Sequence, residues 1–191
     1  MVLGLIKPNS GEILSLINAP NFDPNLLIGR NRSKNYLKLK NDTIGKPLFD
    51  RGLQGMYPPG STFKLMSMIS LLEDNLIDEN TKVDTGNGTM EFFGKYKVKD
   101  SRKGGYGVIT SSKAFEVSSN TGLVKLVYEN YKNSPKKYID RLYNMGLNKT
   151  LNLPIKGEGI PIIPYPSDKN WNGLTLPWMA FGYGVSLTPL Q

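Results

Sequence analysis

The stretch Tyr57-Pro58-Pro59-Gly60-Ser61-Thr62-Phe63-Lys64 decides how the rest of the chain is interpreted. Its two prolines and its glycine end any preceding element, so a new element begins at Ser61. A serine at such a position is a common helix N-cap. The residues that follow, from Leu65 to Leu76, are apolar around most of a helical wheel. A helix of this kind belongs in a domain interior, and we predict a buried helix from Ser61 to about Asn75.

Ser61 and Lys64 are the polar exceptions at the start of this helix. Residues three apart lie on the same helical face. The positive end of the helix dipole and burial both disfavour an ammonium group. Lys64 would then be a neutral amine that accepts the Ser61 hydroxyl proton, which is how a serine nucleophile is activated. The alternative is a capping serine followed by a lysine that reaches solvent.

An S-x-x-K match is weak by itself, because the chain contains a second one at Ser134-Pro135-Lys136-Lys137. That match opens a polar segment and has proline at the first helical position, which is typical of an exposed helix start. Ser61 instead opens the most apolar helical segment of the chain. The context therefore favours Ser61 as the candidate nucleophile.

Composition narrows the chemistry that is available. The 191 residues are enough for one domain with a sizeable core. The chain has no cysteine and no histidine, which excludes disulfides and thiolate catalysis and removes the commonest general base and metal ligand. No metal or other cofactor is implied. The net charge of +8 suits an anionic partner, but the lysines are scattered, which is typical of a solvated surface.

The order of predicted elements indicates an α+β fold. Two short apolar runs, Val2–Ile6 and Ile13–Ile17, predict a β-hairpin. Residues 18–55 predict a long ordered loop with at most one short helix, and residues 81–103 predict a short hairpin or excursion. Further helices are expected over residues 110–117, from Ser118-Ser119-Asn120 onward, and from Ser134-Pro135 to Gly146. Recurring prolines predict extended coil between Leu151 and Pro166.

Several of these segments, taken in order, resemble class B penicillin-binding proteins, the monofunctional peptidoglycan transpeptidases. The first is the stretch from Tyr57 to Lys64, since S-x-x-K is a motif of penicillin-binding proteins. Ser118-Ser119-Asn120 resembles their S-x-N motif, and Gly182–Gln191 resembles the segment after their helical region. The resemblance implies a penicillin-binding protein/serine β-lactamase-like transpeptidase fold. The S-S-N form and residues 178–191 look more like the division type than the elongation type.

The family's third motif, K-[ST]-G, is absent, because Lys149-Thr150-Leu151 lacks the glycine and precedes the Gly182–Gln191 segment. The resemblance therefore covers roughly the first two-thirds of a transpeptidase domain. We expect the membrane anchor, the pedestal domain and the C-terminal third with its sheet strands to lie outside residues 1–191. We also expect this truncated chain to be nearly inactive, because losing one oxyanion-hole donor costs about 10²–10³ in rate. Because its hairpin edge is unpaired, we expect the chain either to self-associate through the hairpin or to leave the hairpin poorly ordered.

The resemblance implies acyl transfer through an acyl-serine. Ser61 would attack the D-Ala-D-Ala stem peptide, with Lys64 as base and Ser118 as the proton relay to the leaving group. Asn120 would bind the substrate amide or the Lys64 ammonium. The implied partners of the parent are peptidoglycan stem peptides, β-lactam antibiotics and cell-division or cell-wall synthesis proteins. The parent would be anchored in the bacterial cytoplasmic membrane with this domain outside, although residues 1–191 show neither a targeting nor a transmembrane segment.

Four alternatives stay open at this point. Ser118 and Asn120 are residue types that often serve only as helix caps. The chain could be a penicillin-sensing domain without turnover, or a relative of serine β-lactamases, but neither a signalling segment nor a water-activating group is assignable. A nucleic-acid binder would need a basic stripe with interleaved aromatic residues, and the sequence has none.

Overall fold

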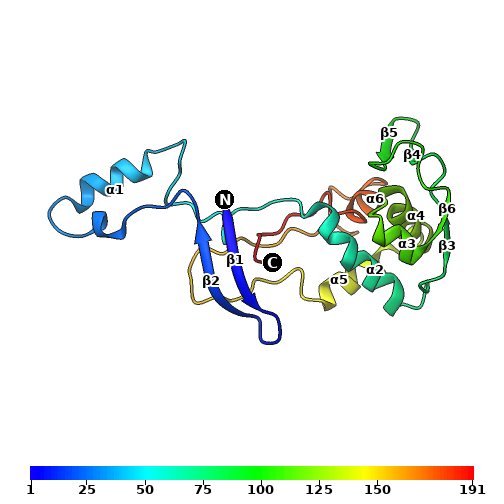
Figure 1. Ribbon diagram of the computed structural model, residues 1–191, viewed down its shortest axis with the longest axis horizontal. Coiled ribbons are helices and arrows are strands. Elements are labelled where there is room, and N and C mark those ends of the chain that lie inside the picture. Colours follow the sequence, from blue (N-terminus) through cyan, green and yellow to red (C-terminus); the bar gives the residue numbers. More distant parts are fainter. The chain divides into compact units, whose positions relative to one another are not determined.

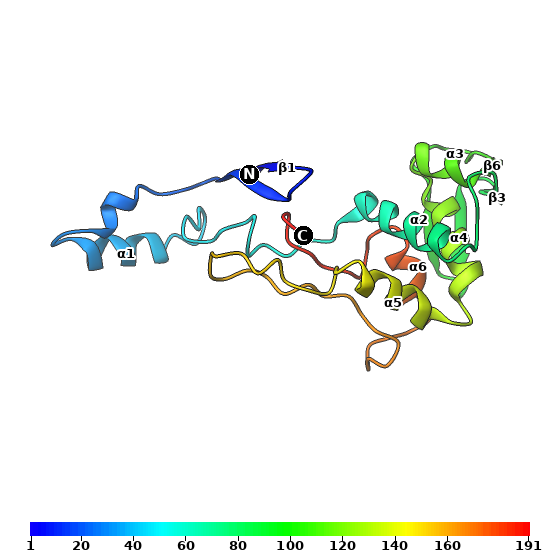
Figure 2. The same cartoon turned by 90° about the horizontal axis from the view of Figure 1, so that it is seen from below.

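The computed structural model describes residues 1–191, which form two compact units (Figures 1 and 2). The hairpin unit contains Met1–Tyr57, Thr150–Pro161 and Leu187–Gln191. The helical unit contains Pro58–Lys149 and Ile162–Ser186. No helix in the chain combines the length and the apolar character that crossing a bilayer requires.

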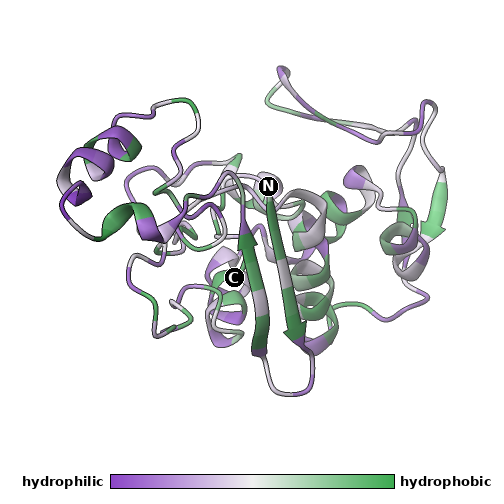
Figure 3. Cartoon of the chain, turned by 60° about the vertical axis from the view of Figure 1, so that its left-hand side comes forward, coloured by the Kyte–Doolittle hydropathy of each residue, from purple (hydrophilic) through white to green (hydrophobic).

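The hairpin unit is built on the antiparallel strands β1 (Val2–Lys7) and β2 (Glu12–Asn18). This confirms the predicted hairpin. Gly11 adopts a positive φ of 70° in the connecting turn, a conformation that glycine accepts without strain. Figure 3 shows apolar residues along both strands, and the side chains of Leu3 and Leu5 are more than half exposed.

The long segment after the hairpin holds two short helices, where the sequence predicted at most one. The 3₁₀ helix η1 (Pro24–Leu27) is capped by Asp23, whose carboxylate accepts a hydrogen bond from Asn25 N at 2.9 Å. Helix α1 (Arg32–Lys40) follows and buries no residue. The segment then reaches Tyr57, whose backbone exchanges two hydrogen bonds with Leu187 at 2.9 and 3.0 Å.

The helical unit contains five α-helices and two separate two-stranded antiparallel sheets. Its helices are α2 (Lys64–Glu73), α3 (Ser111–Glu116), α4 (Asn120–Tyr131), α5 (Pro135–Asn144) and α6 (Thr175–Met179). One sheet pairs β3 (Lys82–Asp84) with β6 (Val108–Thr110), and the other pairs β4 (Thr89–Phe92) with β5 (Tyr96–Lys99). The mixture of helices and short sheets confirms the predicted α+β class.

Helix α4 is the central element of this unit. Leu123, Val124 and Val127 are fully buried on it. Ser119 caps its N-terminus, because the Ser119 hydroxyl accepts a hydrogen bond from Gly122 N at 2.9 Å. The sequence predicted that this helix begins at the S-S-N motif, and the structure confirms it. The buried apolar residues of α4 hold its N-terminal end, and with it the motif, in place.

The prediction that the helix after Ser61 is buried on all sides is wrong. Leu65 and Leu72 on α2 are 45% and 41% exposed, whereas Ser67 and Ser70 are fully buried. The buried serines are tolerated because each is hydrogen-bonded, Ser67 Oγ to Ala180 O at 2.9 Å and Ser70 Oγ to Met66 O at 2.8 Å. Hydrophobicity alone could not identify the buried face, since two of its residues are polar.

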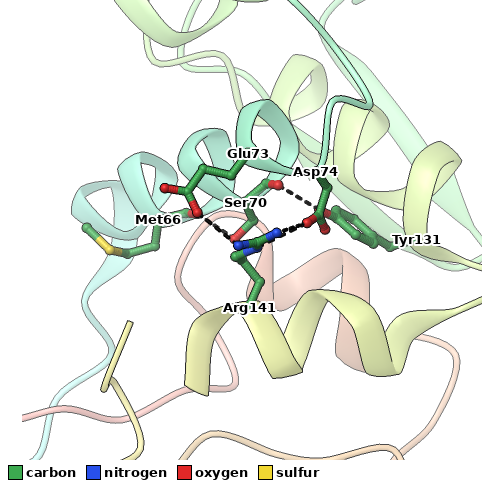
Figure 4. Close-up of polar contacts among 6 residues, drawn as sticks. All are labelled: Met66, Ser70, Glu73, Asp74, Tyr131 and Arg141. Carbon is green, nitrogen blue, oxygen red and sulfur yellow. Dashed lines mark hydrogen bonds and ion pairs between the residues drawn. The ribbon is translucent and has the colours of Figure 1, made fainter. Parts of the chain in front are cut away.

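A polar cluster fastens the C-terminal end of α2 to α4 and α5 (Figure 4). Arg141 on α5 donates hydrogen bonds to the carboxylates of Asp74 and, at 3.0 Å, Glu73. The hydroxyl of Tyr131 on α4 lies 2.8 Å from an Asp74 carboxylate oxygen and 2.9 Å from Ser70 O. Three helices are thus held together at the end of α2 opposite Lys64.

Candidate active site

The candidate nucleophile lies on a short 3₁₀ helix, η2 (Gly60–Phe63), which leads into α2. Ser61 is therefore not an α-helix N-cap, and its side chain is exposed. Gly182 packs against this turn, because Gly60 N donates a hydrogen bond to Gly182 O at 3.1 Å. A Cβ on Gly182 would lie 2.0 Å from Gly60 O. The turn that carries Ser61 is thus held by a backbone contact that only glycine permits.

Lys64 is the first residue of α2 and is 1% exposed. Its Nζ donates three hydrogen bonds, to Ser118 O at 2.7 Å, to Ser118 Oγ at 3.0 Å and to Asn120 Oδ1 at 2.6 Å. An ammonium group has three donors, so these contacts satisfy it completely. The structure therefore brings together Lys64, Ser118 and Asn120 inside the helical unit. Ser61 is three residues away in the chain, and its carbonyl oxygen accepts a hydrogen bond from the backbone N–H of Lys64, but Lys64 Nζ makes no hydrogen bond to Ser61 Oγ.

The protonation of Lys64 is set by two opposing effects. Burial lowers the pKa of Lys64 from its ordinary value to about 8, and the negative charge of Asp100 partly counteracts this by raising it. A lysine with such a pKa has an accessible neutral form near physiological pH, which a surface lysine lacks. The group can therefore act as a base once it has lost a proton.

Ser118 lies at the junction between α3 and α4 in a left-handed conformation with a φ of 54°. This conformation is costly for a residue with a side chain and is often found at functional sites. Here the Ser118 carbonyl and hydroxyl both face Lys64 Nζ. The capping alternative does not apply to Ser118 or Asn120, because Ser119 supplies the cap of α4.

Asn120 is oriented by strand β5, which pairs with β4 in the helical unit. Its Nδ2 donates a hydrogen bond to Lys99 O at 2.7 Å, at the end of β5. The amide group therefore presents Oδ1, its acceptor, to the Lys64 ammonium. Both hydrogen bonds of the side chain are consistent with one amide orientation.

Sequence reasoning missed Lys99 and Asp100, which support the S-S-N segment from β5. The Asp100 carboxylate accepts hydrogen bonds from Ser119 Oγ at 3.1 Å, Thr121 N at 2.9 Å and Thr121 Oγ1 at 2.8 Å. The only signal in the sequence was an acidic residue directly after a short alternating run. No spacing rule connects such a residue with a motif about twenty positions later in the chain.

Comparisons with known proteins identify the family of the chain. Residues 1–191 match the penicillin-binding protein transpeptidase domain. The chain is 32% identical over 197 residues to the peptidoglycan D,D-transpeptidase MrdA of Acinetobacter baumannii and 28% identical over 187 residues to FtsI of Escherichia coli K12. The two alignments include 97% and 98% of this chain. The chain spans only 28% of the length of either relative.

Solved structures give the same result. The chain superposes on a penicillin-binding protein (PBP2) of Helicobacter pylori, solved in complex with MreC, with a TM-score of 0.85 and 28% identity. That alignment covers 100% of this chain and 36% of the other. The protein thus belongs to the penicillin-binding protein transpeptidase family, which confirms the predicted fold. Within it the chain is part of a class B transpeptidase domain of the kind found in MrdA and FtsI.

Proposed function

We propose that this chain carries the nucleophile and base of a serine D,D-transpeptidase that cross-links peptidoglycan. The observation that carries the proposal is the buried Lys64, which is one helical turn from Ser61 and is held by Ser118 and Asn120. A lysine with a lowered pKa next to an exposed serine matches the requirements for an activated serine nucleophile.

In the proposed reaction, Ser61 Oγ bonds to the carbonyl carbon of the penultimate D-alanine while its proton passes to the neutral Lys64 amine. The amide bond to the terminal D-alanine then breaks, Ser118 passes its hydroxyl proton to the departing amine, and the Lys64 ammonium reprotonates Ser118. The amine of a second stem peptide next attacks the acyl-serine, and the bond between the acyl carbon and Ser61 Oγ breaks as the cross-link forms. The proton that this amine loses passes through Lys64 to Ser61 Oγ and restores the hydroxyl. Asn120 holds the Lys64 ammonium or the substrate amide during these steps.

The resting contacts of Lys64 must change for the first step. A neutral amine has two N–H groups and one lone pair, so it cannot keep all three hydrogen bonds of the ammonium. One of the acceptors on Ser118 or Asn120 is then released, and the lone pair becomes free to receive the Ser61 proton. Such rearrangement is consistent with catalytic hydrogen bonds that align only in the substrate complex.

The proposed function determines the partners and the location. The substrates are peptidoglycan stem peptides, and β-lactams acylate Ser61 in their place. Cell-division or cell-wall synthesis proteins assemble with the parent protein, as MreC does with the PBP2 of H. pylori. The parent is anchored in the bacterial cytoplasmic membrane, and this domain lies on the outer side, where peptidoglycan is built.

A role in division rather than elongation is the finer proposal. The Ser118-Ser119-Asn120 form of the second motif and residues 178–191 support it. Relatives named MrdA and FtsI match at similar identity and do not separate the two types. Depletion of the protein in its own bacterium distinguishes them, because a division enzyme leaves long filaments and an elongation enzyme leaves rounded cells.

The proposal is tested with the protein that contains this chain, a D-Ala-D-Ala stem peptide and an acceptor peptide. We expect release of D-alanine together with a cross-linked product, and we expect neither from Ser61→Ala. Acylation by a β-lactam without any peptide turnover would instead indicate a sensor. Rapid hydrolysis of the β-lactam would indicate a β-lactamase. Either result would contradict the proposed transpeptidase.

A further inference from the structure

Asp100 is a charged residue whose part in the site is still unassigned. It directly follows β5 and lies at the N-terminal end of α4, where its carboxylate is met only by neutral donors. These donors are Ser119 Oγ, Thr121 N and Thr121 Oγ1, and Asp100 takes part in no salt bridge. An anion in this position is also favoured by the dipole of a helix as long as α4.

The residues that Asp100 holds alternate with those that hold Lys64. Ser118 and Asn120 bind the Lys64 ammonium, while Ser119 and Thr121 bind Asp100. Four consecutive residues thus bridge a buried cation and a carboxylate that do not touch each other. Asn120 is held from the same strand end, because its Nδ2 donates to Lys99 O.

Asp100 also supplies the charge that opposes the desolvation of Lys64. Ser118 and Asn120, the side chains hydrogen-bonded to Lys64 Nζ, are both neutral. Asp100 is the charged group that acts on Lys64, and its effect is to favour the ammonium form. The negative charge of Asp100 therefore helps to keep Lys64 protonated. Only the protonated form can donate all three hydrogen bonds of the resting site.

We propose that Asp100 is a positioning residue of the active site, which fixes the Ser118–Thr121 segment around Lys64 and stabilises the Lys64 ammonium through space. The inference rests on the proposed roles of Ser61 and Lys64. It assigns two separable effects to one carboxylate. The hydrogen bonds determine how well Ser118 and Asn120 are placed, and the charge determines the pH at which Lys64 becomes a free base.

The test compares β-lactam acylation rates as a function of pH in the protein that contains this chain. Asp100→Asn should shift the midpoint of the rate profile to lower pH and reduce the rate at high pH about tenfold, the effect of losing one charge-assisted hydrogen bond. Asp100→Glu keeps the charge, so it should retain the wild-type midpoint. A merely structural role would lower the rate at every pH without moving the midpoint.

Asp78→Asn is a matched control. Asp78 accepts hydrogen bonds from Asn80 N at 3.0 Å and Thr81 Oγ1 at 2.8 Å, which resemble the contacts of Asp100 with Thr121. Asp78 is not among the groups that act on Lys64, so its variant should leave the midpoint in place. The proposal is overturned if Asp100→Asn keeps the wild-type midpoint, or if Asp78→Asn moves it equally.

Two further measurements separate the parts of the proposal. Thr121→Val removes one hydrogen bond to Asp100 and leaves its charge, so it should lower the rate without moving the midpoint, and an unchanged rate would contradict the positioning role. NMR titration of Lys64 in Ser61→Ala needs no acylation, and Asp100→Asn should lower the Lys64 midpoint there as well. Failure of wild-type acylation would refute the proposed function, while this titration would still decide the role of Asp100.

Discussion

Lys64 Nζ lies 2.6 Å from Asn120 Oδ1, although the two residues are 56 positions apart in the chain. This contact joins the start of α2 to the start of α4. Each helix begins at one of the two motifs, S-x-x-K and S-x-N, so the contact converts two separate sequence patterns into one site.

Lys64→Arg should abolish acylation, because a guanidinium group stays protonated and cannot accept the Ser61 proton. General-base catalysis contributes about 10²–10⁴-fold, so we expect a loss of at least about 100-fold. The measurement is the second-order rate constant for a fluorescent penicillin. Lys113→Ala is the control, because Lys113 forms an exposed ion pair with Glu116. A Lys64→Arg rate close to that of the control would contradict the role of Lys64 as base.

The acylation rate should rise with pH, reach half of its maximum near pH 8 and level off at higher pH. Burial lowers the pKa of Lys64 to about 8, the net result after the opposing effect of Asp100. Below this pH the ammonium dominates and has no lone pair, whereas above it the neutral amine is available. The measurement is the pseudo-first-order rate over a series of buffers at constant ionic strength. A rate that falls with pH across this range would show that Lys64 does not act as the base.

Gly182→Ala should displace the turn that carries Ser61. Gly182 has a φ of 84°, and an added Cβ would meet Gly60 O at 2.0 Å. Gly184→Ala is a matched control, because Gly184 has a φ of 73° but no atom within 4 Å of the added carbon. In the control, the free energy of unfolding should fall only by the cost of placing alanine in a left-handed conformation, about 1–2 kcal/mol. Equal thermal stability and acylation in the two variants would contradict the importance of the Gly60–Gly182 contact.

Tyr131→Phe should lower the free energy of unfolding by about 1–2 kcal/mol, because it removes a buried hydroxyl that binds Asp74 and Ser70 O. Tyr128→Phe on the same helix is the control, since the Tyr128 hydroxyl makes no hydrogen bond. Chemical denaturation measures the free energy of unfolding of both variants. Equal effects of the two substitutions would mean that the polar cluster at the end of α2 contributes nothing to stability.

Stability should also fall in acid through Asp74. Burial by itself would raise the pKa of Asp74, but hydrogen bonds from Arg141 and Tyr131 and the charges of Arg141 and Lys137 outweigh it, so that the pKa is lowered. A carboxyl group with a lowered pKa stabilises the fold fully above its unfolded value of about 4, and this contribution is lost as the pH falls through its folded value. Asp74→Asn should therefore weaken the acid dependence of the melting temperature. An unchanged acid dependence would contradict this role of Asp74.

Local elements of the fold could be predicted because short-range chemistry fixes them. Thr110 caps α3 by accepting a hydrogen bond from Lys113 N at 3.1 Å, as its position before a helical run indicates. Pro135 opens α5, and Gly146 with its φ of 84° lies just beyond the end of that helix. Caps, prolines and glycines act within a few residues, so the sequence displays them directly.

Other features depend on contacts that the sequence does not display. The exposed side of α2 could not be predicted, because Ser67 and Ser70 are buried through hydrogen bonds formed in the fold. Asp100 could not be assigned, because its contacts with Ser119 and Thr121 span about twenty residues. The motifs indicated Lys64 and Asn120, but not the β5 backbone that orients the Asn120 amide.

The central claim is that Ser61 is the nucleophile activated by Lys64. It is tested most directly by treating the protein that contains this chain with a β-lactam and locating the covalent adduct by mass spectrometry of its peptides. The account predicts one acyl group on Ser61 in the wild-type protein and none in Ser61→Ala. An adduct on another residue, or an adduct that persists in Ser61→Ala, would contradict it.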